Sequence, residues 1–317
     1  MTDTQNEVFK TPVNKIRLFE HGAPGSQNLK LTRKYYTEDM PDGRVKHIVR
    51  NITDPDIVPY IPDGIGNSTD RQRIPAVLII PGGAFRRLVY NFEGEDIAKW
   101  LNSMGIAAFV LECRLPSDEH DNAEDVPLID AMRAMRVIRG RAQEFGIDEA
   151  KIGVMGFSAG GFMAALLSTA YESDVYAGYK YKDEYDKLSA RPDFAVCSYP
   201  VISIDDCIEA GKRYMSEEQV LERISDSKAK ILHKYNPDKL VRPDMPPVFI
   251  CETDDDRTTL SENSVGFYMA ARKAGVSAEL HIFRTGGHGY GCGDDFAQTG
   301  EWKVLFTKWI KSIGIIS

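Results

Sequence analysis

The pentapeptide Gly156-Phe157-Ser158-Ala159-Gly160 holds a serine in the pattern Gly-x-Ser-x-Gly. An apolar run that predicts a strand precedes it, and an alanine-rich run that predicts a helix follows it. In a sharp strand-to-helix turn, the glycines avoid clashes with the backbone and the hydroxyl projects above the sheet. The pattern therefore predicts that Ser158 is a nucleophile and that the N–H of Ala159, at a helix N-terminus, faces a developing anion.

A serine hydroxyl is a weak nucleophile until a base accepts its proton. Among the six histidines, His288 stands in a glycine-rich segment directly after the last predicted strand. His281 lies inside that strand and is expected to be structural. An imidazole with an ordinary pKa of about 6.5 can accept and return a proton at neutral pH. We therefore predict that His288 is the base.

A carboxylate is expected to orient this base, and three adjacent aspartates, Asp254, Asp255 and Asp256, follow the predicted strand 247–253. Since like charges repel, only one of them is expected to face the histidine, while the others face water or cap the next helix. The residues favour Asp256 and leave Asp255 as the alternative. The chain order Ser, Asp, His, with each member after a strand, is the order of α/β-hydrolases.

The reaction also needs hydrogen-bond donors for an oxyanion. The segment Pro81-Gly82-Gly83-Ala84-Phe85 follows the predicted strand 76–80, and its small residues let backbone N–H groups face the serine. Gly83 and Ala84, together with Ala159, are the predicted oxyanion hole. The residues predicted to line the substrate pocket are Phe85, Arg86, Arg87 and Tyr290.

Short apolar runs alternate with helical stretches from Pro75 onwards, which predicts a parallel sheet covered by helices on both faces. We predict an irregular segment over residues 1–43 and one doubly wound α/β domain over 44–317. A charged, helical insert at about 203–245 is predicted to cap the C-terminal edge of the sheet, with a surface excursion as the alternative. The predicted strands are 45–52, 76–80, 106–113, 152–157, 193–199, 247–253 and 278–283, and the predicted helices are 94–104, 126–144, 159–171, 261–274 and 301–313.

Composition excludes several classes of protein. The 317 residues carry 39 Lys and Arg against 47 Asp and Glu, a net charge of −8, which disfavours nucleic acid or an anionic membrane as the main partner. No apolar stretch is long enough to predict a membrane span. The polar N-terminus does not resemble a signal peptide, so we expect a cytoplasmic protein, or a secreted one if the N-terminus was trimmed.

Cysteines and motifs give no sign of a cofactor. The five cysteines do not form a disulfide framework, and Cys113, Cys197 and Cys251 lie in or beside apolar runs, which predicts buried thiols. No His-Glu-x-x-His motif, Cys/His ligand cluster or strand-end Gly-x-Gly-x-x-Gly is found. We therefore expect neither a metal nor a dinucleotide.

These motifs resemble the carbohydrate-esterase branch of the α/β-hydrolases, which contains bacterial acetyl xylan esterases and feruloyl-esterase-like proteins. The resemblance spans most of the chain from Ile16 to Gly291. It implies that the nucleophile, acid and base are Ser158, Asp256 and His288, because the family's aspartate precedes by six residues the Glu-Asn-Ser that matches 262–264. The stretches that carry it include 77–116, 152–167, 246–264 and 279–291.

The resemblance implies a serine esterase that removes acetyl or other short acyl groups from xylan-derived or other carbohydrate esters through an acyl-enzyme. A feruloyl esterase or a general short-chain carboxylesterase is the alternative. A serine peptidase and a non-catalytic binding protein of the same fold are less favoured. The expected partner is a small-molecule or oligosaccharide ester, and self-association of the chain stays open.

The chain departs from the family pattern at several positions. Ala84 replaces the third glycine of the oxyanion loop, and Arg257-Thr258-Thr259-Leu260 replaces the usual Pro-Val-Val-Pro after the acid. Glu93 and Arg114 match family positions near the site, and we expect them to pair and to brace the oxyanion loop. The tyrosine-rich stretch 171–185 is expected to be a packed surface loop, with stacking on sugar rings as the alternative.

Overall fold

The computed structural model describes residues 9, 12–64, 73–213, 215–216, 218–220, 227–293 and 298–317. Within them, continuous apolar runs such as Ile74–Ile80 and Ala107–Glu112 form strands whose side chains are buried on both faces. The main sheet has the strand order β1-β4-β7-β5-β8-β9-β10-β11. Its strands are β1 (Ile16–Arg17), β4 (Asp56–Tyr60), β5 (Ile74–Ile80), β7 (Ala107–Glu112), β8 (Ile147–Phe157), β9 (Ala195–Ser198), β10 (Val248–Thr253) and β11 (Ala278–Phe283).

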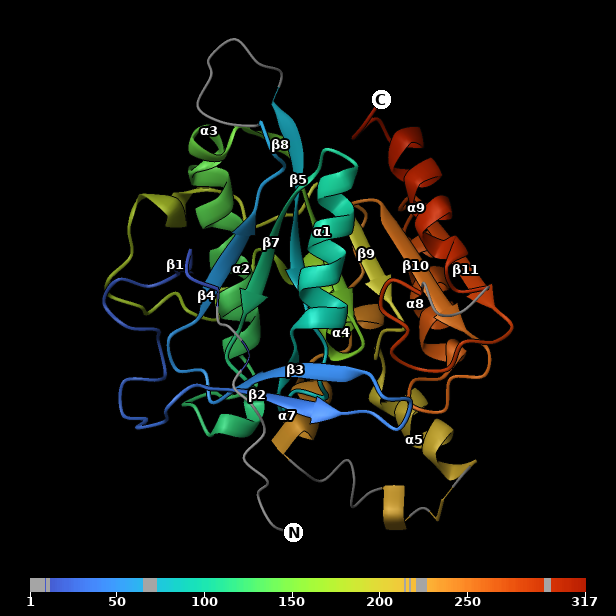
Figure 1. The fold of residues 1–317 in the computed structure, drawn as a ribbon. Coiled ribbons are helices and arrows are strands. Elements are labelled where there is room, and N and C mark those ends of the chain that lie inside the picture. The colour runs from blue at the N-terminus through green and yellow to red at the C-terminus, as the bar shows by residue number, and fades with distance from the viewer. Residues whose placement is uncertain are drawn as a thin grey trace.

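The strands from β7 to β11 in this order run parallel, whereas β1 and β4 pair antiparallel at one edge. Helices cover both faces, as predicted: α1 (Asp96–Ser103) and α9 (Glu301–Ser312) lie on one face, and α2, α4 and α8 lie on the other (Figure 1). Trp100 of α1 packs edge-on against Trp302 of α9, with ring centroids 5.0 Å apart. The helices of the other face are α2 (Val126–Gly140), α4 (Ala159–Ala170) and α8 (Ser261–Lys273).

Several predicted boundaries differ in the structure, most of all that of β8, which starts at Ile147 and not at residue 152. The predicted helix 126–144 is broken, because α2 ends at Gly140 and a short α3 (Ala142–Phe145) follows it and ends at Gly146, whose φ is +66°. Strand β5 starts at Ile74, two residues before the prediction. The helices α4, α8 and α9 agree with their predicted ranges to within one residue.

The prediction that residues 1–43 are irregular is wrong in part. Lys34–Asp39 forms strand β2, which pairs with β3 (Val45–Arg50), and β3 pairs in turn with β6 (Leu88–Val89) in a second, antiparallel sheet. The side chains of Leu18 and Phe19 are buried in the main core. Strand β2 was missed because charged residues flank its Tyr35-Tyr36-Thr37 stretch, which itself favours a strand, so no continuous apolar run marks it.

The predicted insert contains α5 (Ile204–Lys212) and α7 (Ser227–Lys234). Both helices lie with the β2–β3 hairpin at the end of the main sheet where the parallel strands finish (Figure 1). Lys234 Nζ lies 2.6 Å from Asp125 Oδ1 and ties α7 to the residue before α2. Residues 214, 217 and 221–226 of this predicted insert lie outside the described residues.

Two further expectations concern thiols and membranes. Cys113, Cys197 and Cys251 are buried with free thiols, which confirms that prediction. Of the helices in the described ranges, none combines the length and the apolar character that a membrane crossing requires.

A cluster of buried charges attaches the N-terminal segment to the main sheet. The carboxylate of Glu112, at the end of β7, is fully buried and lies 2.7 Å from both Lys15 Nζ and Arg33 Nη1. It also accepts a hydrogen bond of 2.9 Å from the hydroxyl of Tyr35 on β2. These three donors come from segments before residue 40, so the cluster holds these segments against the edge of the sheet.

We expect Glu112→Gln to lower the free energy of unfolding by about 1–2 kcal/mol, because one of the two buried carboxylates that face Lys15 and Arg33 loses its charge, while Asp56 stays 2.5 Å from Arg33 Nη1. The matched control is Glu144→Gln, since Glu144 forms an exposed ion pair with Arg141 on α3. Its loss should cost less than about 0.5 kcal/mol. Urea unfolding of both variants measures the difference, and equal effects would contradict the role given to the cluster.

Candidate active site

Ser158 occupies the turn between β8 and α4 with φ +54° and ψ −119°, a backbone conformation that residues other than glycine seldom adopt. The glycines on either side are sterically required. A Cβ on Gly156 would lie 1.9 Å from the carbonyl oxygen of Gly160, and a Cβ on Gly160 would lie 2.0 Å from that of Ile80. The predicted tight turn is therefore present, and it holds the serine above the end of the sheet.

The structure brings together the three side chains that the sequence singled out. Ser158 Oγ lies 2.8 Å from His288 Nε2, and His288 Nδ1 lies 2.7 Å from Asp256 Oδ2. Because an ionised carboxylate only accepts, the proton of the neutral imidazole sits on Nδ1, and Nε2 is left to accept the serine proton. The three residues follow β8, β11 and β10, whose parallel arrangement places their ends side by side.

Asp256 is held in the ionised form. Its side chain is buried, which raises the pKa, but the hydrogen bond and charge of His288 and the backbone N–H groups of Thr258 and Thr259 bring the pKa of Asp256 below its ordinary value. Those N–H groups lie 2.7 and 3.0 Å from Oδ1, and Thr259 Oγ1 lies 3.0 Å from Oδ2. The departure from the family's Pro-Val-Val-Pro thus adds a hydroxyl donor to the acid.

Asp255, the alternative acid, faces a different group. Its Oδ1 accepts a hydrogen bond of 2.8 Å from the backbone N–H of Gly287. Burial is slight, and the N–H groups of Gly287 and Gly286 lower the pKa of Asp255. The structure therefore places Asp256 against the imidazole and Asp255 against the backbone of the loop that carries it.

The oxyanion loop lies against the serine turn. A Cβ on Gly82 would lie 2.9 Å from Ser158 Cβ. Gly83, Ala84 and Phe85 have φ values of +138°, +57° and +58°, so the chain turns sharply here. Among the described residues, the N–H groups of Gly83 and Ala84 have no hydrogen-bond partner. The N–H of Ala159 opens α4 and has no acceptor within that helix.

The expected Glu93–Arg114 pair does not form. Arg114 instead makes a buried ion pair with Asp130 on α2, with Nη2 and Oδ1 2.7 Å apart. Glu93 still braces the oxyanion loop, because its Oε2 accepts a hydrogen bond of 2.8 Å from the N–H of Gly82, and its Oε1 accepts one of 3.0 Å from the hydroxyl of Tyr199. Sequence analysis missed Tyr199, which it placed as the last residue of the predicted strand 193–199 and which follows β9 (Ala195–Ser198) in the structure.

The residues predicted to line the pocket occupy three environments. Phe85 and Arg87 line a small cavity beside the oxyanion loop, and Arg87 also pairs with Glu38 of β2, with 2.7 Å between Nη1 and Oε1. Tyr290, two residues after His288, is buried, and its ring centroid lies 4.5 Å from that of Tyr199, so its side chain packs in the interior and does not line the cavity. Arg86 follows Phe85 in the loop and is not part of the cavity wall.

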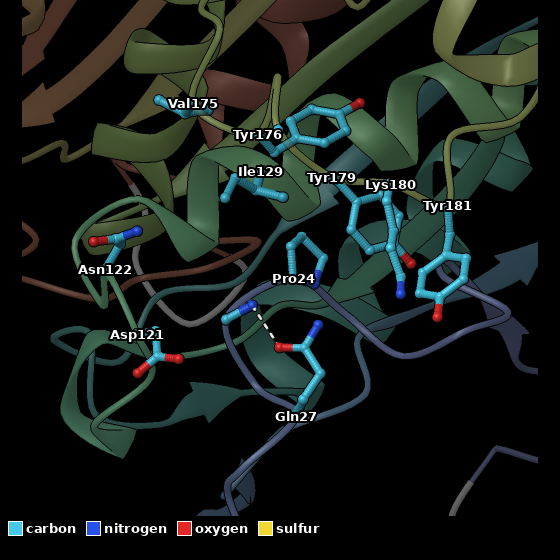
Figure 2. A pocket seen from close by; sticks show the side chains of 12 residues that line it. Pro24, Gln27, Asp121, Asn122, Ile129, Val175, Tyr176, Tyr179, Lys180 and Tyr181 are labelled. Carbon is cyan, nitrogen blue, oxygen red and sulfur yellow. Dashed lines mark hydrogen bonds between the residues drawn. The ribbon is translucent and has the colours of Figure 1, made fainter.

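The tyrosine-rich stretch lines a separate groove of about 530 Å³ together with Pro24, Gln27 and the 121–122 segment (Figure 2). None of Ser158, Asp256 and His288 lines it. The hydroxyl of Tyr176 donates to Asp186, and that of Tyr179 donates to the carbonyl of Gly22. These hydroxyls bond within the protein, as expected for a packed surface loop, whereas the ring of Tyr181 is 44% exposed at the groove, so stacking on a sugar ring stays the alternative.

Among the residues that the structure describes, no group of three or more His, Cys, Asp or Glu side chains is arranged to hold a metal ion. The densest acidic run, Asp254–Asp256, contributes one carboxylate to the imidazole and another to backbone N–H groups.

Comparison with known proteins identifies related chains. A family model described as BD-FAE matches residues 65–270. The acetylxylan esterase of Xylanibacter ruminicola is 31% identical over 240 residues, which are 75% of this chain and 45% of that protein. Endo-1,4-beta-xylanase B of Butyrivibrio fibrisolvens is 31% identical over 227 residues, 71% of this chain and 34% of that protein. The chain thus spans less than half the length of these curated relatives.

Solved structures show the same architecture. The acetyl ester-xyloside bifunctional hydrolase of Caldicellulosiruptor lactoaceticus has 34% sequence identity and a TM-score of 0.71, with 96% of this chain and 97% of that chain covered. The esterase Est2 of Thermogutta terrifontis shares the fold at 24% identity and a TM-score of 0.64, over 93% of this chain and 96% of that chain. The predicted α/β-hydrolase fold is confirmed.

We expect Gly160→Ala to destabilise the protein by about 3 kcal/mol, because the new Cβ would push α4 away from the carbonyls of Ile80 and Pro81. The control is Gly178→Ala, since Gly178 lacks a positive φ and a Cβ there would meet nothing within 4 Å. Thermal unfolding measures both variants. A melting temperature for Gly160→Ala equal to that of the control would contradict the steric argument.

Proposed function

The chain belongs to the BD-FAE family, and from this premise we propose that it is a serine esterase that removes acetyl or other short acyl groups from xylan-derived or other carbohydrate esters. The observation that carries the proposal is the unbroken contact from Ser158 Oγ through His288 to Asp256, at 2.8 and 2.7 Å. The names of the acetylxylan esterase and of the acetyl ester-xyloside hydrolase support the choice of acyl group and sugar.

The proposed reaction starts when His288 Nε2 accepts the proton of Ser158 as Oγ attacks the ester carbonyl. The oxyanion of the tetrahedral intermediate accepts hydrogen bonds from the N–H of Ala159 and from those of Gly83 or Ala84. The imidazolium, stabilised by Asp256, protonates the sugar alcohol as it leaves. Water then attacks the acyl-enzyme by the same proton transfers and releases the carboxylic acid.

A cavity of about 10 Å³ lies beside the oxyanion loop, at the lower limit of what one water molecule needs. Its wall includes the apolar side chains of Phe85, Leu88, Leu115 and Met163. Neither Ser158 nor His288 lines it, so this cavity does not select between acetyl and feruloyl groups. The proposed preference for a short acyl group therefore rests on the names of the relatives.

The proposed function is tested by measuring acetate release from acetylated xylo-oligosaccharides beside the hydrolysis of methyl ferulate and p-nitrophenyl acetate. We expect acetate release and p-nitrophenyl acetate turnover to exceed ferulate release. Ser158→Ala should lower kcat about a millionfold, by analogy with other serine triads. Faster turnover of the ferulate would select the feruloyl esterase. Wild-type protein that is inert to all three esters and to a serine-directed phosphonate would exclude an esterase.

The two candidate acids can be separated by matched variants. Asp256→Asn should lower kcat about 10⁴-fold, because an amide favours the wrong imidazole tautomer and cannot stabilise the imidazolium. Asp255→Asn keeps an oxygen that can accept the N–H of Gly287, so its kcat should stay within a few-fold of wild type. Turnover of p-nitrophenyl acetate by both variants gives the comparison. The opposite ranking would assign the acid to Asp255.

A further inference from the structure

We propose that Glu93 and Tyr199 form a bridge that holds the oxyanion loop and the histidine loop at a fixed distance from each other. Both are positioning residues for the reaction, since the groups they hold, and not they themselves, meet the substrate. This inference rests on the proposed esterase function. It concerns the geometry that makes the proton acceptor and the oxyanion donors act at one carbonyl group.

Three hydrogen bonds make up the Glu93–Tyr199 bridge. The N–H of Gly82 donates to Glu93 Oε2 over 2.8 Å, and the hydroxyl of Tyr199 donates to Glu93 Oε1 over 3.0 Å. The N–H of Gly291 donates to the Tyr199 hydroxyl oxygen over 3.2 Å. The bridge therefore runs from the residue before the oxyanion donors to the loop that carries the base.

Tyr199 also lies close to two members of the triad, His288 and Asp256. Its ring stands edge-on to the imidazole of His288, with centroids 5.1 Å apart. Its carbonyl oxygen lies 3.2 Å from Thr259 Oγ1, whose one proton is donated to Asp256 Oδ2 over 3.0 Å. One residue thus touches the base directly and the acid through a single hydroxyl.

Burial and backbone geometry indicate that this arrangement is held firmly. Glu93 is 5% exposed and Tyr199 is fully buried, so water does not compete for their hydrogen bonds. Tyr199 has a φ of +37°, which is unfavourable for a tyrosine and persists only where surrounding contacts enforce it. A Cβ on Gly291 would lie 2.8 Å from the carbonyl oxygen of Phe92, so the histidine loop packs directly against the segment that carries Glu93.

The bridge should matter more for turnover than for binding. A displacement of about 1 Å between reacting groups can lower a rate about 100-fold. The residues that bind the substrate before the reaction can stay in place during such a displacement. If Gly82 or Gly291 loses its acceptor, the donors and the base can drift apart without any change in the substrate pocket. We therefore expect kcat to fall while KM stays the same.

The experiment compares Tyr199→Phe and Glu93→Gln with the control Tyr179→Phe. The first removes only the hydroxyl and keeps the ring against His288, whereas the second leaves an amide that cannot accept from both Gly82 and Tyr199. The control removes a hydroxyl that bonds to Gly22 beside the separate groove. With p-nitrophenyl acetate, each bridge variant should lower kcat at least about tenfold at unchanged KM, and the control should match wild type.

The double variant tests whether the two residues act as one unit. Because each single change breaks the same bridge, Tyr199→Phe with Glu93→Gln should be no slower than the slower single variant. A loss equal to the product of the two single losses, or a loss no larger than that of Tyr179→Phe, would overturn the proposal.

Amide hydrogen exchange gives a readout that does not depend on ester hydrolysis. The N–H of Gly82 bonds to Glu93 and not to Tyr199, yet Tyr199→Phe should accelerate exchange of the Gly82 amide as well as that of Gly291, because Glu93 loses the hydrogen bond from the Tyr199 hydroxyl. Unchanged exchange at Gly82 would overturn the bridge. Should wild-type protein hydrolyse no ester, the proposed function fails alone, and exchange at Gly82 still decides whether the two loops are coupled.

Discussion

The placement of the serine against the oxyanion loop depends on the close approach of Gly160 to the carbonyl of Ile80. This approach brings the first turn of α4 against the end of β5, and the oxyanion loop continues directly from that strand. No side chain fits between them. The distance from the serine to the oxyanion donors is thus fixed by backbone packing, which varies less than contacts between long side chains.

Buried acids around this backbone contact have contrasting electrostatic environments. Asp256 gains enough donors and positive charge to overcome burial, so its pKa falls. Burial raises the pKa of Glu252, and the neighbouring charge of Asp256 raises it further. Burial also raises the pKa of Glu93. Burial is the largest influence on the pKa of all three acids, and only at Asp256 do the donors and the charge of His288 outweigh it.

Local signals predicted the parts of this protein that depend on local sequence. The alternation of apolar runs with helices predicted the parallel strands from β5 to β11, because strands buried on both faces must be apolar. The Gly-x-Ser-x-Gly turn and the glycine-flanked His288 were found because their backbone shapes need glycine. The choice of Asp256 needed the family resemblance as well, since three adjacent aspartates look alike in the sequence.

Features that arise from tertiary contacts were not predicted. Strand β2 lacks an apolar run, and its pairing with β3 adds to the strand preference of its tyrosines. The predicted partner of Glu93 was wrong, because the sequence pattern of charged residues does not indicate which carboxylate accepts a hydrogen bond from a backbone N–H. Tyr199 was missed for a similar reason, since a tyrosine after an apolar strand resembles ordinary core packing.

The buried carboxylate of Glu112 also bears on where the folding unit begins. A boundary drawn at residue 43 would discard Lys15, Arg33 and Tyr35 and would leave that carboxylate without its three donors. It would also remove Glu38, the counter-ion of Arg87 beside the oxyanion loop. The segment before the first parallel strand therefore belongs to the folded domain. Shortening the protein there would remove the donors of the buried Glu112 and the ion pair of Arg87 beside the oxyanion loop.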